Sequence, residues 1–217
     1  MIKFYDWLKT MRIVEEQTPP KVLWFTGMGS TGTNARQLAA HGYDVKQVGT
    51  TTNHYAASIG WLNQFQPMHT LLKSTAQSIG QQHLQKNVEK HDGEMKGTNF
   101  VPDIVVGSSQ GGALAMQVAH QYPHAKFVLA SPAWKIFAAD PSKLPKDSII
   151  IQGTNDRQVV PSSNIDLKDR FGYEVRIYNT GHKIPFEMIK DAVDTQLKRL
   201  GIPVPESVKQ NMTTAVL

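Results

Sequence analysis

The chain has 217 residues, of which 40% are hydrophobic and 19% charged, and this composition is typical of one globular domain. Its formal net charge of +5 comes from scattered lysines and arginines without a run of five basic residues, so no nucleic-acid partner is expected. The absence of cysteine excludes disulfides, thiolate metal sites and a cysteine nucleophile.

The N-terminal segment reads MIKFYDWLKTMRIVEE and mixes apolar with charged residues. Its charges interrupt the apolar core that a secretory signal needs, so no signal is predicted. Phe4, Trp7, Leu8 and Met11 follow helical spacing, which predicts a short amphipathic helix. No stretch approaches the ~18 apolar residues of a membrane span. We therefore expect a cytoplasmic protein without a membrane span.

Short apolar segments of strand length alternate with helix-like segments along the chain. Several, such as DIVVG and SIIIQG, are almost continuously apolar, as strands covered on both faces of a parallel sheet are. The alternation predicts an α/β fold with a doubly wound, mainly parallel sheet of about six strands and helices on both faces. The predicted strands are Val22–Thr26, Val45–Val48, Asp103–Gly107, Lys126–Ala130, Ser148–Gln152 and Glu174–Tyr178. We expect one domain, 1–217, with a C-terminal tail at 202–217.

A long connection, roughly residues 50 to 100, separates the second and third predicted strands. Its second half is expected to be helical, whereas its first half is aromatic without a clean period. It starts at the carboxyl edge of the sheet, where ligands bind in open α/β folds. Residues 50–72 are therefore predicted to form a lid or flap. Trp61, Phe65 and Met68 are candidates to line a substrate pocket, and ordinary packing explains them equally well.

The segment DIVVGSSQGGALAMQVA places a G-x-S-x-G motif between a buried strand and a helix. In this motif the nucleophile has a strained backbone conformation on a turn so tight that neighbouring side chains would clash. Gly107 and Gly111 flank Ser109 at the required spacing, which predicts Ser109 as a nucleophile. A serine in an ordinary glycine-rich turn is the alternative.

A serine nucleophile needs a base and an acid that orients the base. Asp156 follows one late predicted strand, and His182 follows the last one in a glycine turn. Parallel strands end at one edge of a sheet, so these two side chains can converge on Ser109. Asp140, Asp147, Asp166 and Asp169 are alternative acids, and Asp140 is singled out because it follows the preceding strand.

A metal site is not predicted. His120 and His124 have the i, i+4 spacing of a helical metal pair, but Pro123 breaks the helix that would aim both at one ion. The proposed chemistry also needs no other cofactor.

Together these motifs resemble those of the α/β-hydrolase superfamily, over roughly residues 22–200. The similar segments are FTGMGSTG, GSSQGG, GTNDRQVVP and NTGH. The chain departs from many members at residues 26–29, which read Thr-Gly-Met-Gly in place of His-Gly-x-Gly. The resemblance implies that Met28 and Gln110 supply the two backbone N–H groups of an oxyanion hole, so that their side-chain identities matter little.

The glycines of residues 27–32 also fit the G-x-G-x-x-G pattern of a dinucleotide loop. A dinucleotide site would want an acidic residue at the end of the next strand, and that strand ends KQVGTTTN without one. An oxyanion turn is therefore the preferred interpretation of this loop.

The expected function is a serine hydrolase that cleaves carboxylic ester or thioester bonds through an acyl-enzyme, with Ser109, His182 and Asp156 as its triad. Trp134, in the loop after the fourth strand, is a further pocket candidate. An acyltransferase with the same triad and a catalytically idle binding protein remain alternatives. The expected partner is a small acyl ester or thioester, and the sequence leaves the oligomeric state open.

Overall fold

The computed structural model describes residues 18–52, 54–61 and 70–206. Six parallel strands form one sheet in the order β2-β1-β3-β4-β5-β6. Each predicted strand lies within one residue of an observed one at both ends, so the predicted fold class is confirmed. The strands are β1 (Lys21–Phe25), β2 (Asp44–Val48), β3 (Ile104–Ser108), β4 (Lys126–Ala130), β5 (Ile149–Gly153) and β6 (Glu174–Tyr178).

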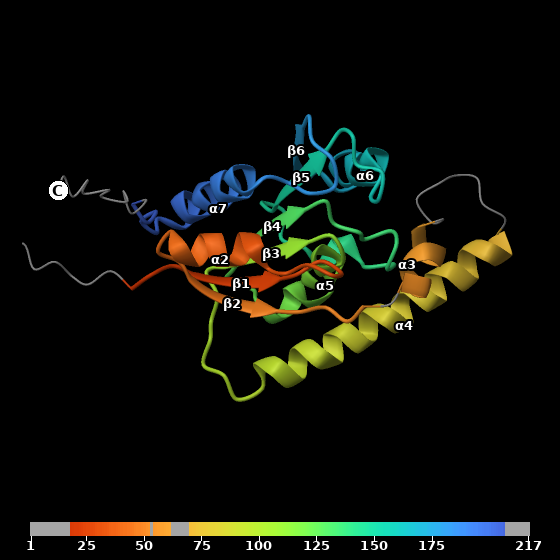
Figure 1. The fold of residues 1–217 in the computed structure, drawn as a ribbon, viewed down its shortest axis with the longest axis horizontal. Helices are drawn as coiled ribbons and strands as arrows, with labels where there is room; N and C mark the ends of the chain where they lie inside the picture. Colours follow the sequence, from red (N-terminus) through yellow and green to blue (C-terminus); the bar gives the residue numbers. More distant parts are fainter. Residues whose placement is uncertain (1–17, 53, 62–69, 207–217) are drawn as a thin grey trace, which may run out of the picture.

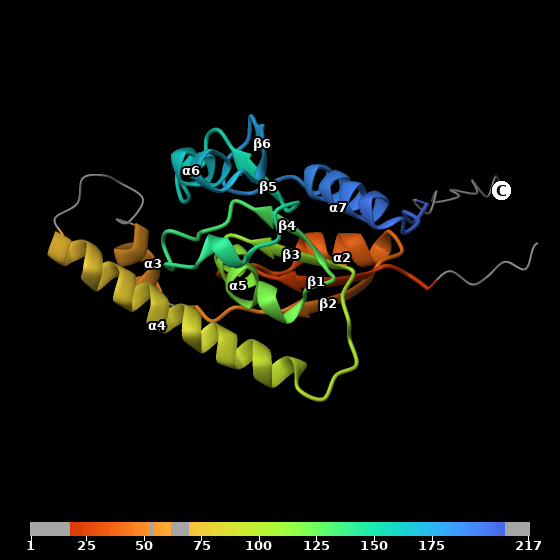
Figure 2. The ribbon, with the colours of Figure 1, turned by 180° about the vertical axis from the view of Figure 1, so that it is seen from behind.

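Helices cover both faces of the sheet (Figures 1 and 2). One face packs against α2 (Thr33–Ala40) and α7 (Phe186–Leu200). The other face packs against α5 (Gln110–Val118) and α6 (Pro161–Phe171), and α4 (Thr70–Met95) crosses α5 on its outer side. Two short 3₁₀ helices, η2 (Ala119–Gln121) and η3 (Pro141–Lys143), lie in the connections after α5 and β4.

The central strands are buried on both faces, which explains their nearly continuous apolar sequences. Successive side chains of a strand point to opposite faces. In β1, Leu23 and Phe25 enter the core beside α5, whereas Val22 and Trp24 enter the core beside α2 and α7. The edge strands β2 and β6 are only partly buried. The sheet is therefore the rigid layer from which the functional loops extend.

The carboxyl ends of all six strands meet at one edge of the sheet, and α3 (His54–Trp61) lies beyond that edge (Figure 1). The helix expected in the second half of the long connection is α4. The predicted N-terminal helix, residues 62–69 of the predicted flap and most of the predicted C-terminal tail lie outside the described residues. None of the helices in the described ranges is both long and apolar enough to cross a membrane.

Candidate active site

Ser109 is the single residue between β3 and α5, and its backbone is strained. Its φ of 53° and ψ of −117° are rare for a residue with a side chain. The turn is so tight that a Cβ added at Gly107 would lie 2.7 Å from the Gly111 carbonyl oxygen. A Cβ added at Gly111 would lie 2.3 Å from the carbonyl oxygen of Phe25. The two glycines therefore make this turn sterically possible.

Backbone hydrogen bonds hold Ser109 in this conformation. Its N–H donates to the Ala130 carbonyl at 2.9 Å, at the end of the neighbouring strand β4. Its carbonyl accepts from the N–H groups of Ala133 at 2.9 Å and Gly112 at 3.0 Å. A strained backbone conformation persists only where surrounding interactions hold it in place, and these hydrogen bonds do so for Ser109.

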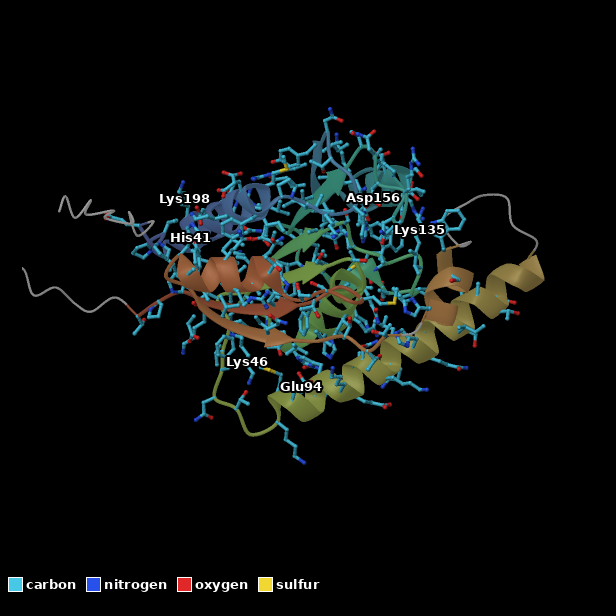
Figure 3. All side chains as sticks on the ribbon, in the orientation of Figure 1. His41, Lys46, Glu94, Lys135, Asp156 and Lys198 are labelled. Atoms are coloured by element: carbon cyan, nitrogen blue, oxygen red, sulfur yellow. The ribbon has the colours of Figure 1, made fainter. Side chains whose placement is uncertain are left out.

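Asp156 and His182 form a hydrogen-bonded pair. Asp156 follows β5 (Figure 3) and is 3% exposed, and its Oδ2 lies 2.8 Å from Nδ1 of His182. Its Oδ1 accepts from the N–H groups of Gln158 and Val159, both at 2.9 Å. Burial acts to raise the pKa of Asp156, but the hydrogen bonds and charge of His182 and the two N–H donors together lower it below the ordinary value. The ionised carboxylate requires a proton on Nδ1, which leaves Nε2 of His182 as the basic nitrogen.

The alternative acid, Asp140, has a different role. It is exposed and caps η3, where its Oδ1 accepts from the Ser142 N–H at 2.9 Å and the Ser142 hydroxyl at 2.6 Å. These bonds from Ser142 lower the pKa of Asp140. Asp140 lines a separate hollow beside α4, whereas His182 is bonded to Asp156. The structure thus pairs the histidine with Asp156.

The loop after β1 lies directly against the serine turn. A Cβ added at Gly27 would lie 3.2 Å from both the Ser109 Cβ and the Ser108 carbonyl oxygen. Met28 follows Gly27 and lines two cavities together with Ser109. Gln110 is the first residue of α5, whose N-terminal backbone N–H groups lack partners within the helix. The two residues expected to form an oxyanion hole therefore both adjoin Ser109.

The side chain of Gln110 is part of a buried polar network, contrary to the expectation that its identity matters little. Its Nε2 donates to the Thr51 carbonyl at 3.0 Å and lies 2.7 Å from Nε2 of His83. Asn87, one turn along α4 from His83, accepts from the Thr51 N–H at 2.7 Å. Because an amide nitrogen only donates, Nε2 of His83 accepts, and burial lowers the pKa of His83 and favours this neutral form.

Two cavities meet at Ser109. The one of about 420 Å³, here called the polar cavity, extends along the glycine loop to α7, and it includes His182. The one of about 360 Å³, here called the apolar cavity, extends beneath α3. The polar cavity is lined by Trp24, Gly27, Met28, Gly29, Ser30, Thr31, Gly32, Thr33, Asn34, Ser108, Ser109, Gln158, His182, Lys183, Ile184 and Ile189. The apolar cavity is lined by Met28, His54, Ala57, Ser58, Trp61, Ser109, Gln110, Ala133, Ile136, Phe137, Arg157, Gln158 and Val159.

The predicted pocket residues have different positions. Trp61 lines the apolar cavity and is 37% exposed. Phe65 and Met68 lie outside the described residues. Trp134 packs in the core instead, 8% exposed, with its Nε1 donating to the Ser163 carbonyl at 3.0 Å. Other residues of the same loop line the cavity in its place, and the sequence offered no period that could separate them from Trp134.

Comparisons with known proteins identify solved structures with a similar fold. No model of a known protein family matches the chain, and no curated protein matches its sequence. Est1E from Butyrivibrio proteoclasticus is similar in structure, with 16% identity and a TM-score of 0.51 over 85% of this chain and 90% of Est1E. Acetyl xylan esterase 1 from Thermoanaerobacterium has 15% identity and a TM-score of 0.51 over 84% and 75% of the two chains.

A third similar structure is XC6422 from Xanthomonas campestris, an α/β serine hydrolase without a lid. It has 12% identity and a TM-score of 0.52 over 89% of this chain and 87% of its own. At these identities the likeness concerns the fold. The chain has the α/β-hydrolase fold that its motifs predict.

Proposed function

We propose that the protein is a serine hydrolase that cleaves carboxylic ester or thioester bonds through an acyl-enzyme. The observation that carries the proposal is the arrangement of three side chains. Ser109, on its strained turn, lines the same cavity as His182, and the His182 Nδ1 is bonded to the buried Asp156. Nucleophile, base and orienting acid thus follow β3, β6 and β5, in the order that this fold requires.

In the first half of the proposed reaction, Nε2 of His182 takes the proton of the Ser109 hydroxyl as Oγ attacks the carbonyl carbon of the substrate. The backbone N–H groups of Met28 and Gln110 stabilise the oxyanion that forms. His182 then gives the proton to the leaving oxygen or sulfur as the bond to the acyl carbon breaks, and the acyl group stays on Ser109.

In the second half, water replaces the leaving group. His182 takes a proton from water, the hydroxide oxygen attacks the acyl carbon, and the proton returns to Ser109 as the acid is released. The Asp156 carboxylate remains ionised and stabilises the imidazolium that forms in both halves. The similarity of the fold to named esterases supports hydrolysis as the reaction class.

A panel of acyl esters and thioesters of varied chain length tests the proposal. Wild-type protein should hydrolyse members of the panel, and Ser109→Ala should reduce the rate by about 10³-fold or more, since triad members act as a unit. Ser78→Ala, at an exposed serine of α4, is the matched control and should retain full activity. If Ser109→Ala keeps the wild-type rate, the proposal is wrong. Product analysis with added alcohols separates hydrolysis from acyl transfer.

A further inference from the structure

The two cavities at Ser109 differ in the chemistry of their walls. The polar cavity presents hydroxyl and amide side chains and one ammonium group, from Ser30, Thr31, Thr33, Asn34 and Lys183, beside the apolar side chains of Trp24, Ile184 and Ile189. The apolar cavity presents mainly aliphatic and aromatic side chains, from Ala57, Trp61, Ala133, Ile136, Phe137 and Val159. Arg157 also lines the apolar cavity and, like Lys183, is exposed to solvent, so the lining of each cavity includes one exposed cation. An acyl substrate has two parts on either side of its carbonyl carbon, so each part can occupy one cavity.

The position of His182 decides which part occupies which cavity. In acylation His182 must deliver a proton to the leaving oxygen or sulfur, so the leaving group has to lie on the histidine side of Ser109. His182 lines the polar cavity, and the apolar cavity is lined instead by Gln110, the expected oxyanion donor. The leaving group therefore points into the polar cavity, and the acyl chain points away from it, beneath α3.

The lysine in the wall of the polar cavity gives it a positive charge. Lys183 is exposed and lines it, and no aspartate or glutamate is among its lining residues in the described part of the chain. Arg36 adds a second cation beside the loop, where it donates to the Thr31 carbonyl at 2.5 Å and to the Thr33 hydroxyl at 3.4 Å. Asp156 is buried and bonded to His182. A negatively charged group on the leaving side would therefore be attracted by Lys183 and would meet no carboxylate among the described residues that line the cavity; Glu187, four residues after Lys183, is exposed in the first turn of α7.

We infer that the substrate is an ester or thioester whose apolar acyl chain occupies the apolar cavity and whose polar, anionic leaving group occupies the polar cavity near Lys183. This inference rests on the proposed function. It names Lys183 and Trp61 as specificity-determining residues on opposite sides of Ser109.

One arm of the test varies the leaving group at fixed acyl chain. Two esters whose leaving groups have the same pKa, one neutral and one carrying a sulfonate, are compared by kcat/KM. Wild type should prefer the anionic ester by about fivefold at low salt, with less preference at high salt. Lys183→Gln should abolish the preference and Lys183→Arg should retain it. Lys96→Gln, an exposed lysine at the far end of α4, should leave it unchanged.

The other arm varies the acyl chain at a fixed leaving group. Trp61→Ala should shift the optimum to a different acyl length and leave the ratio between anionic and neutral esters unaltered. Ester hydrolysis that depends on Ser109 but shows no anionic preference, or a preference that Lys183→Gln leaves intact, overturns the inference alone. A shift in leaving-group preference from Trp61→Ala would reverse the orientation. If no acyl substrate is turned over, the proposed function itself fails.

Discussion

At the scale of single residues, the proposed chemistry depends on a backbone conformation that most residues avoid. Ser109 has a positive φ, and the space for its turn exists because Gly107 and Gly111 lack side chains. The cost of such strain is of order 1–3 kcal/mol and is met by the surrounding hydrogen bonds. The two glycines of the motif are therefore required for the tight turn that presents the serine hydroxyl.

Gly111→Ala should lower the free energy of unfolding by roughly 2–3 kcal/mol, because its methyl group would overlap the backbone of Phe25 and Thr26. Gly93→Ala is the matched control. Gly93 lies on the exposed side of α4 with open space around it, so alanine there should stabilise by up to ~1 kcal/mol. Urea denaturation measures both. Equal effects of the two variants would show that the turn can relax.

Asp156→Asn should lower kcat by about 10²–10⁴, because an amide at this position favours the wrong imidazole tautomer. Asp140→Asn should leave kcat within about twofold, since Asp140 caps η3 and asparagine caps equally well. Ester hydrolysis under saturating substrate compares the two variants. The reverse ranking would assign the orienting acid to the loop after β4.

At the scale of elements, the side chain of Gln110 bonds the long connection to the serine turn. Gln110 at the start of α5 bonds to the Thr51 carbonyl and to His83 of α4, so the connection and the proposed oxyanion donor share one buried network. α3 forms the adjoining wall of the apolar cavity. Whether residues 50–72 open and close as a lid stays a prediction. The network predicts that any such motion is anchored at Thr51.

His83→Gln should make stability less sensitive to pH. His83 is 4% exposed, and burial lowers its pKa, so the unfolded chain binds more protons below its ordinary pKa of about 6.5. Native stability should therefore fall as pH drops from about 6.5 towards the lowered value. Glutamine can still accept from Gln110 but cannot be protonated. Urea denaturation at pH 7.5 and pH 5 measures the difference, and an unchanged difference in the variant would contradict this role.

Replacing each of two tryptophans by alanine should distinguish Trp61, in the wall of the apolar cavity, from Trp134, which does not line it. Trp61→Ala should cost less stability than Trp134→Ala, because the Trp61 side chain is 37% exposed and buries less apolar surface. Trp134→Ala should cost about 3–5 kcal/mol, because that side chain is 8% exposed and part of the core. Thermal and urea unfolding of both variants tests the assignment. Equal losses would show that Trp61 supports the fold as much as the core residue Trp134 does.

At the scale of the whole molecule, six parallel strands bring distant loops to one edge, and this much follows from the sequence. Runs such as SIIIQG identify buried strands, and the motifs with Ser109, Asp156 and His182 each follow one of them. The apolar strand sequences therefore predict the sheet, and the position of each motif after a strand predicts the edge at which the candidate site forms.

Side-chain partners that depend on packing could not be predicted. Gln110 and His83 are 27 residues apart, and no pattern links a residue after a serine motif to a histidine on a preceding helix. Trp134 and its apolar loop neighbours Ala133, Ile136 and Phe137 are all buried, so only the folded chain shows that Trp134, unlike these three, does not line the cavity. These side-chain partners are residues whose positions in the sequence show no regular spacing, so they are found only in the folded structure.

The central claim is that Ser109 is the nucleophile, and covalent labelling tests it most directly. Intact-mass and peptide analysis after incubation with a fluorophosphonate should find one adduct, on the peptide that contains Ser109. The adduct should be absent from folded Ser109→Ala and present in Ser108→Ala. Labelling of Ser109→Ala at the wild-type rate, or no labelling of the wild-type protein, would contradict the claim.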